Sequence, residues 1–147
     1  MALSLSRERL YPGRLPSANR WKSGPLVPES STSRRILLVD CDAFFVQVAR
    51  LEDPEGAGRA ECLIVGGSAT GRGVVTSASY AARAFGVRSA MPTAHALRLC
   101  PQAKVASVPR GAISARSLVV REALEDLSPV VQPASVDEFY LDLSGTE

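Results

Sequence analysis

The stretch ASVDEFYLDLSG, residues 134–145, places two acidic side chains next to each other, Asp137 and Glu138. The residues after them alternate between apolar and polar, which is typical of a half-buried β-strand with the apolar residues of Phe139–Leu143 on the buried face. In a regular strand the two acids would point to opposite faces. Both can reach one site only if the chain bends just before them, near Ala134 to Val136, at a hairpin turn or bulge.

The first strand that we expect also ends in an acid. In RRILLVDCD, residues 34–42, the apolar run Ile36–Val39 is followed by Asp40, the pattern of a central strand that reaches a site at its C-terminal end. If Asp40 meets Asp137, two carboxylates about 4 Å apart repel each other by roughly 4 kcal/mol at an effective dielectric constant of about 20. Glu138 would increase this repulsion. A divalent cation removes the conflict, and hard oxygen ligands suit Mg²⁺.

A second interpretation of these acids needs no cation. Glu138 and Asp142 would line a solvated face, while Asp137 would cap a turn. The spacing alone does not decide between the two interpretations.

The rest of the chain alternates short strand and helix patterns, separated by Gly and Pro. The expected strands are CLIVGG (62–67), VVTSAS (74–79), AKVASVP (103–109), PVVQPAS (129–135) and VDEFYLDLSG (136–145). The expected helices are AFFVQVARLED (43–53), for which Asp42 suits the N-cap, YAARAFG (80–86), TAHALRLCP (93–101) and AISARSLVVREALEDLSP (112–129). GGSATGRG (66–73) lacks the GK[ST] ending of a P-loop, so we interpret it as a connection between strands. Together these patterns predict an α+β domain, with helices on one face of a mainly antiparallel sheet.

Composition limits the class of protein. A chain of 147 residues with 46% hydrophobic content can bury one ordinary core, and no run of about 18 apolar residues predicts a membrane span. Its three cysteines form no CxxC pair, which favours a reducing cytoplasm without a zinc site. Residues 1–35 carry seven basic against two acidic side chains, and we expect them to form a flexible basic extension. Residues 36–147 carry ten basic and thirteen acidic side chains, which does not suit a basic nucleic-acid clamp.

Three stretches in order carry a family resemblance: LLVDCDAFFVQV (37–48), GRGVVTSASYAARAFGVRSAMPTAHALRLCP (71–101) and SVDEFYLDLSG (135–145). The chain resembles the N-terminal part of a Y-family, translesion DNA polymerase of the polymerase IV type. The resemblance implies that residues 36–147 form a palm and a small fingers subdomain, the latter at approximately 54–108.

The resemblance also implies a site. Asp40, Asp137 and Glu138 would be catalytic and would hold two Mg²⁺ ions, together with the backbone carbonyl of Cys41. Phe45 would be the steric gate that excludes ribonucleotides. The residues expected to contact the triphosphate are Ser77, Tyr80 and Arg83, of which the last two lie at i and i+3 on one helix.

The implied function is template-directed DNA synthesis by nucleotidyl transfer from dNTPs, in translesion synthesis and DNA repair. The implied partners are primer–template DNA, a dNTP and a sliding clamp bound through a region downstream of Glu147, without a membrane. Two departures qualify this expectation. RGAISARSLVVRE (110–122) lacks the family's pattern of Asp, Tyr and Ser, and the chain ends before the family's thumb and little finger, so we expect a truncated and inactive fragment.

Two other classes remain as alternatives. A non-catalytic scaffold in lesion bypass would be expected to lose the three acids, which are present here. A receiver-like phosphoacceptor domain also opens with an apolar strand and an acid pair. That class needs an Asp at the end of the third strand, and CLIVGG ends without one.

Overall fold

A computed structural model describes residues 34–144 of the protein. The predicted extension, residues 1–35, therefore lies outside the described residues except for its last two. In chain order the elements are β1 (Ile36–Asp40), α1 (Phe44–Glu52), β2 (Leu63–Gly66), β3 (Val75–Ala78), α2 (Tyr80–Ala84), α3 (Thr93–Leu99), β4 (Lys104–Ala106), α4 (Arg110–Glu125), β5 (Val131–Pro133) and β6 (Glu138–Asp142). Each corresponds to an element that the sequence predicts, and the α+β class is confirmed.

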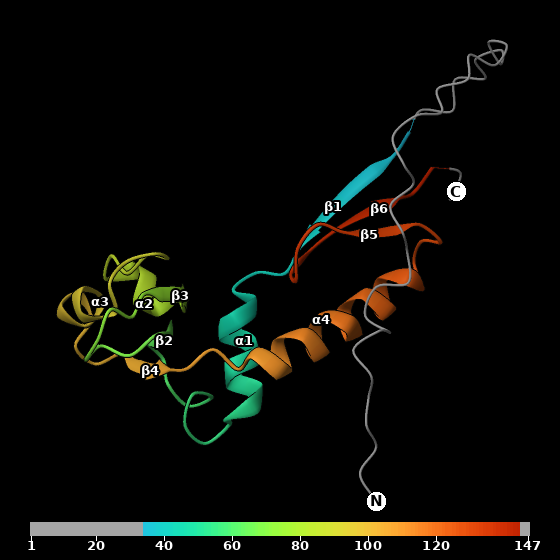
Figure 1. Ribbon diagram of the computed structural model, residues 1–147. Helices are drawn as coiled ribbons and strands as arrows, with labels where there is room; N and C mark the ends of the chain where they lie inside the picture. The colour runs from blue at the N-terminus through green and yellow to red at the C-terminus, as the bar shows by residue number, and fades with distance from the viewer. Residues whose placement is uncertain (1–33, 145–147) are drawn as a thin grey trace, which may run out of the picture. The chain divides into compact units, whose positions relative to one another are not determined.

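The strands of the described part form two three-stranded sheets (Figure 1). The first has the order β1-β6-β5 and is antiparallel throughout. The second has the order β3-β2-β4, with β2 antiparallel to β3 and parallel to β4. The sequence patterns identify the strands but not their division between two sheets.

The position of β1 differs from the prediction. It was expected to be a central strand, whereas within the described residues it is an edge strand and β6 is central. Ile36 and Leu38 of β1 remain 56% and 48% exposed. An apolar run indicates that a strand can be buried, but it does not specify how many neighbours the strand pairs with.

Helix α1 connects the second sheet to α4. Val46 and Ala49 pack with Leu63 and Val65 of β2, whereas another side of the helix, with Phe44 and Val48, packs against Ile113 of α4. These two contact surfaces follow from apolar residues at spacings of three and four on a helix. The loop between β1 and α1 is therefore held close to the second sheet.

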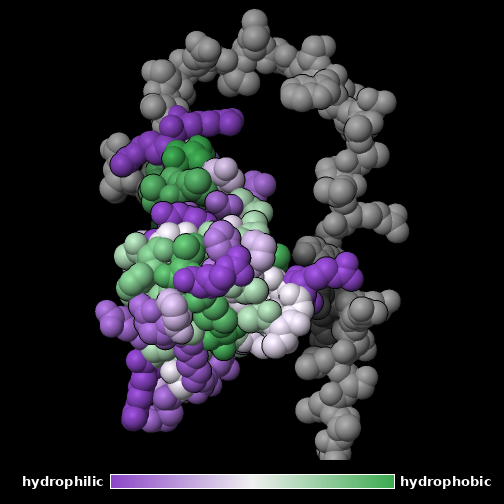
Figure 2. Space-filling model, turned by 90° about the vertical axis from the view of Figure 1, so that its left-hand side faces the viewer, coloured by the Kyte–Doolittle hydropathy of each residue, from purple (hydrophilic) through white to green (hydrophobic). Residues whose placement is uncertain are grey.

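A third apolar cluster fixes α2 and α3 on the second sheet. Ile64, Val75 and Ala78 of the sheet pack with Ala82 of α2 and Ala96 of α3. Figure 2 views this part of the molecule from outside, and its surface mixes hydrophilic and hydrophobic side chains. Helix α2, which carries Tyr80 and Arg83, is held on the second sheet through its buried Ala82.

Two glycines have a clear structural reason. Gly86, which follows α2, has a φ of 89°, a left-handed conformation that suits glycine at a helix C-terminus. In the loop between β2 and β3, a Cβ on Gly73 would lie 2.2 Å from the Ser68 carbonyl oxygen. Close backbone approach explains Gly73 of GGSATGRG without a phosphate ligand, whereas a Cβ on Gly71 would meet nothing within 4 Å.

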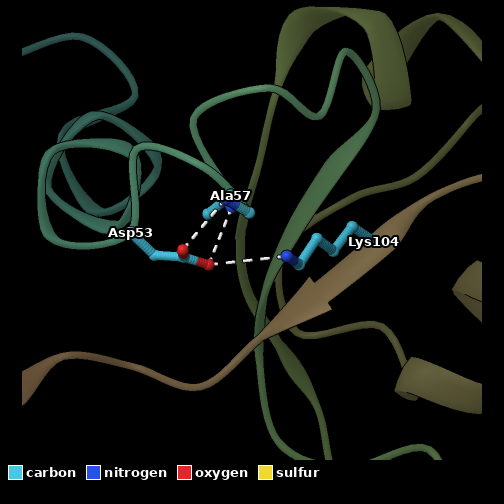
Figure 3. A network of polar contacts seen from close by, with 4 residues as sticks. Asp53, Ala57 and Lys104 are labelled. Atoms are coloured by element: carbon cyan, nitrogen blue, oxygen red, sulfur yellow. Dashed lines mark hydrogen bonds and ion pairs between the residues drawn. The ribbon is translucent and has the colours of Figure 1, made fainter.

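The loop after α1 is closed by a carboxylate (Figure 3). Asp53 accepts hydrogen bonds from the backbone N–H groups of Gly56 and Ala57, both at 2.9 Å, and its Oδ2 lies 3.4 Å from Lys104 Nζ. These contacts, with the Ala57 hydrogen bond as the largest cause, lower the pKa of Asp53 below its usual value. The carboxylate therefore links the loop to β4 while it is ionised.

This arrangement predicts a pH dependence. Because the pKa of Asp53 is lower in the folded chain, its ionised form stabilises the fold above the unfolded pKa of about 4, and this contribution is lost as the pH falls through the folded pKa. The Asp53→Asn variant should therefore lose less stability than the unsubstituted chain between pH 5 and pH 2. Urea unfolding midpoints at several pH values measure the difference. Equal losses for both proteins would contradict it.

Within residues 34–144, the structure contains no helix whose length and apolar character would let it cross a membrane.

Candidate active site

The hairpin between β5 and β6 turns just before the two adjacent acids. The Ala134 N–H donates to the Glu138 carbonyl oxygen at 2.8 Å and closes the turn. The Ser135 hydroxyl accepts hydrogen bonds from the N–H groups of Asp137 and Glu138, at 3.2 and 3.1 Å, and donates to Asp137 Oδ1 at 2.6 Å. The bend predicted at this point is confirmed, and one serine hydroxyl organises it.

Ser135 was not among the residues selected from the sequence. Its signal was the spacing Ser-x-Asp, because a serine two residues before an aspartate can bond both to the backbone and to the carboxylate. The residue orients one of the predicted ligands rather than acting as a ligand itself.

The Ser135→Ala variant is expected to lose about 1 kcal/mol of folding stability, since one exposed hydroxyl satisfies two backbone donors. The Ser135→Thr variant keeps a hydroxyl and should recover part of the loss. Urea unfolding of both variants measures the effect. If alanine and threonine behave alike, the hydroxyl does not hold the turn.

The register of β1 and β6 places acids opposite each other. Asp40 pairs directly with Glu138, and beyond this pair the Cys41 N–H donates to the Asp137 carbonyl oxygen at 2.8 Å. Directly opposed residues of an antiparallel pair lie on the same face of the sheet, about 4.5–5.5 Å apart. Like charges in this position destabilise a sheet. The fold therefore holds a repulsive pair that a bound cation would relieve.

A cavity of about 280 Å³ lies beside this pair. Of the eight residues predicted for the site, six lie on its wall: Asp40, Cys41, Phe45, Ser77, Arg83 and Asp137. Glu138 and Tyr80 are not on this wall. The cavity is thus shared by the β1–α1 loop, the β5–β6 hairpin and β3 with α2.

The three carboxylates do not form one ligand set in the described part of the chain. Within residues 34–144, no group of three or more His, Cys, Asp or Glu side chains is arranged to hold a metal ion. None of Asp40, Asp137 and Glu138 takes part in the four ion pairs of this region either. Their oxygens are of the kind that Mg²⁺ prefers, and among the described residues no cationic side chain forms an ion pair with them, so the donor set fits Mg²⁺ in chemistry.

The negative charges of Asp137 and Asp40 affect the pKa of Cys41. Burial raises the pKa of the half-buried Cys41 thiol above its usual value, and the negative charges of Asp137 and Asp40 raise it further. The potential at this edge of the cavity is therefore negative.

The two adjacent phenylalanines of α1 have different surroundings. Both line the cavity, but Phe44 is buried and packs with Val48 and Ile113, whereas Phe45 is half-buried. Their rings meet edge to face, with centroids 6.1 Å apart. Phe44 thus belongs to the core, and Phe45 is the more exposed of the two residues on the cavity wall.

The second sheet contributes a hydroxyl and a guanidinium to the cavity. Ser77 of β3 is 93% buried and lies on the wall. Arg83 of α2 donates from Nε to the Ala78 carbonyl oxygen at 2.8 Å, which fixes its guanidinium beside the sheet. The Ser79 hydroxyl caps α2 by accepting from the Ala82 N–H at 3.3 Å. The cap and the Ala78 contact together hold Arg83 in place.

Tyr80 and Asp42 are arranged differently from the prediction. The Tyr80 hydroxyl donates to Asp42 Oδ2, and the Arg83 guanidinium lies 5.2 Å from the centre of the tyrosine ring. Asp42 does not cap α1. The N-cap residue is Ala43, in a left-handed conformation and without a side-chain hydrogen bond. The sequence could not show this, because the partner of Asp42 lies 38 residues away.

The topology also excludes the receiver interpretation. A receiver has a doubly wound parallel sheet with its first strand between parallel neighbours. Here β1 pairs antiparallel with β6 in a sheet that, within residues 34–144, has no parallel pair. That interpretation is therefore wrong.

Comparisons with known proteins show the family of the chain. Residues 39–147 match the model of the impB/mucB/samB family. DNA polymerase IV of Pseudomonas fluorescens (strain Pf0-1) is 42% identical over 113 residues, which are 77% of this chain and 31% of that protein. DNA polymerase IV of Yersinia enterocolitica serotype O:8 is 46% identical over 111 residues, which are 76% of this chain and 31% of that protein. The chain thus spans about a third of the length of these curated relatives.

Solved structures show the same fold. DinB from Sulfolobus solfataricus matches with a TM-score of 0.68 and 31% sequence identity, over 76% of this chain and 32% of that one. A post-insertion binary complex of Dbh DNA polymerase matches with a TM-score of 0.68 and 30% identity, over the same shares. The chain therefore belongs to the impB/mucB/samB family, and it is similar to the N-terminal region of Y-family DNA polymerases of the polymerase IV type.

Proposed function

We propose that the chain is the N-terminal catalytic portion of a DNA polymerase that adds deoxynucleotides from dNTPs to a primer on a DNA template, in translesion synthesis and DNA repair in the cytoplasm. The observation that carries the proposal is the pairing of Asp40 with Glu138, which Asp137 directly precedes on the hairpin. The relatives named DNA polymerase IV support the reaction class.

In this proposal the two sheets have different tasks. The β1-β6-β5 sheet, with α1 and α4, is the palm that holds the acids. The β3-β2-β4 sheet, with α2 and α3, is the fingers subdomain at approximately residues 54–108. The second sheet supports this division because it is built entirely from residues 63–106.

The site also assigns tasks to individual residues. Asp40, Asp137, Glu138 and the Cys41 carbonyl would hold two Mg²⁺ ions, whose chemistry is to acidify the primer 3′-hydroxyl and neutralise the triphosphate and leaving pyrophosphate. Arg83 and Ser77 bind phosphate oxygens from the other side of the cavity. Phe45 excludes a 2′-hydroxyl by its bulk, so it selects deoxynucleotides.

Nucleotide binding tests this function without requiring DNA synthesis. The chain should bind dATP only with Mg²⁺ and bind ATP about tenfold or more weakly, the range expected when a pocket rejects one added group. In the Phe45→Leu variant the preference for dATP should largely disappear. The Phe85→Leu variant is the control, since Phe85 is exposed and lies away from this cavity.

Isothermal titration calorimetry measures the dATP and ATP affinities of all three proteins. Binding of dATP and ATP with equal affinity to the unsubstituted chain would contradict the proposed selectivity. If neither Mg²⁺ nor nucleotide binds, the scaffold class is favoured instead.

A further inference from the structure

The hydrogen bond between Tyr80 and Asp42 occupies the only proton donor of the phenol. A tyrosine hydroxyl has one O–H, and a carboxylate and an ionised phosphate can both only accept. While Tyr80 donates to Asp42, it has no proton to donate to a triphosphate oxygen. The two acceptors therefore compete for one donor.

Arg83, the neighbour of Tyr80 on α2, is in the opposite situation. Its Nε is bound to the Ala78 carbonyl oxygen, but no hydrogen-bond acceptor for its two terminal nitrogens is found among residues 34–144. These nitrogens can bind phosphate without breaking an existing hydrogen bond. Of the two side chains, only Tyr80 must give up a bond when a triphosphate arrives.

The location of Asp42 strengthens this difference. Asp42 lies on the wall of the cavity, whereas Tyr80 does not. The Tyr80 hydroxyl is bonded to this wall residue, and the bond is the largest cause that raises the pKa of the phenol above its usual value. The exposed carboxylate is also a negative charge beside the place proposed for the phosphates.

From this geometry we infer that Asp42 sets the nucleotide affinity of the site, by holding the Tyr80 hydroxyl in a hydrogen bond that an incoming triphosphate must break. The inference rests on the proposed function, because it requires nucleotide in this cavity. Asp42 acts through Tyr80 and is a positioning residue, not a ligand of metal or substrate. No bond other than a hydrogen bond changes in this exchange.

A double-mutant cycle on the full chain tests the inference, with dATP and Mg²⁺ as the probe and calorimetry as the readout. In the Asp42→Asn variant the acceptor is neutral and weaker, so dATP should bind about fivefold more tightly than to the unsubstituted chain. In the Tyr80→Phe background, which lacks the hydroxyl, Asp42→Asn should change the affinity much less. A structural defect would instead weaken binding in both backgrounds.

The Glu61→Gln variant is the matched control for loss of charge. Glu61 lies with Tyr80 on the wall of a second, smaller cavity, and no hydrogen bond of its side chain is found among residues 34–144. The Glu61→Gln variant should bind dATP with an affinity within about twofold of that of the unsubstituted chain, because the charge it removes is exposed and screened.

The outcomes separate this inference from the function on which it rests. Tighter binding by Asp42→Asn that disappears in the Tyr80→Phe background supports it. Weaker binding by Asp42→Asn, or the same gain in both backgrounds, overturns the inference while the proposed function stands. Failure of the unsubstituted chain to bind dATP overturns both.

Discussion

The Asp40→Asn variant is expected to be slightly more stable than the unsubstituted chain without divalent cations, and to bind Mg²⁺ at least about a hundredfold more weakly. The first effect arises because Asp40 lies directly opposite Glu138, and removal of one of two like charges across a strand pair is worth about 0.5–1 kcal/mol. The second effect arises because Asp40 is a proposed ligand. Losing a residue that only supports a ligand lowers metal affinity about tenfold to a hundredfold, and losing the ligand itself costs more.

Thermal or urea unfolding with and without MgCl₂ measures both effects. At a Mg²⁺ concentration a hundred times its Kd, the unsubstituted chain should gain about 2.7 kcal/mol, and Asp40→Asn almost nothing. Glu122→Gln, which removes one exposed charge from α4, should respond to Mg²⁺ like the unsubstituted chain. A normal Mg²⁺ response in Asp40→Asn would remove Asp40 from the proposed site.

The Phe139→Ala variant is expected to lose about 4 kcal/mol of folding stability. Phe139 is 1% exposed and is the largest fully buried side chain of the described residues. Truncation of a buried phenylalanine removes its transfer free energy and leaves a cavity, at a cost of about 3–5 kcal/mol. Phe139 directly follows Glu138 on β6. The Phe139→Ala variant should therefore also bind Mg²⁺ more weakly, because the strand that carries Glu138 is held less firmly.

The next residue on β6 is a matched control. Tyr140 is 44% exposed and, by the alternation of a strand, points to the opposite face. The Tyr140→Ala variant should lose less than about 1.5 kcal/mol, and urea unfolding compares the two variants directly. Equal losses would show that the first sheet does not bury one face as the structure indicates.

Local patterns were sufficient for the elements. The alternation from Phe139 to Leu141 gave β6, and helical spacing gave α1 and α4. Gly86 marked the end of α2, because its positive φ is a local requirement. The bend before Asp137 was also predictable, since two adjacent acids cannot otherwise approach one site.

Long-range pairing could not be predicted in the same way. The division of six strands into two sheets and the edge position of β1 depend on which distant strand each one meets. Asp42 has the residue type of an N-cap, but Tyr80 of α2 provides a hydrogen-bond donor that no local pattern reveals. The roles of Ser77, Tyr80 and Arg83 came from the family resemblance, and the i, i+3 spacing of Tyr80 and Arg83 alone equally fits a solvated helix face.

Paramagnetic broadening by Mn²⁺ tests most directly whether the acids of β1 and of the β5–β6 hairpin share a cation site. Mn²⁺ accepts the same oxygen ligands as Mg²⁺, and it broadens nuclear magnetic resonance signals of nearby residues. The account predicts that the amide signals of residues 40–42 and 137–138 broaden first and recover when Mg²⁺ is added. Broadening centred on other acids, such as those of α4, or broadening that Mg²⁺ does not reverse, would contradict it.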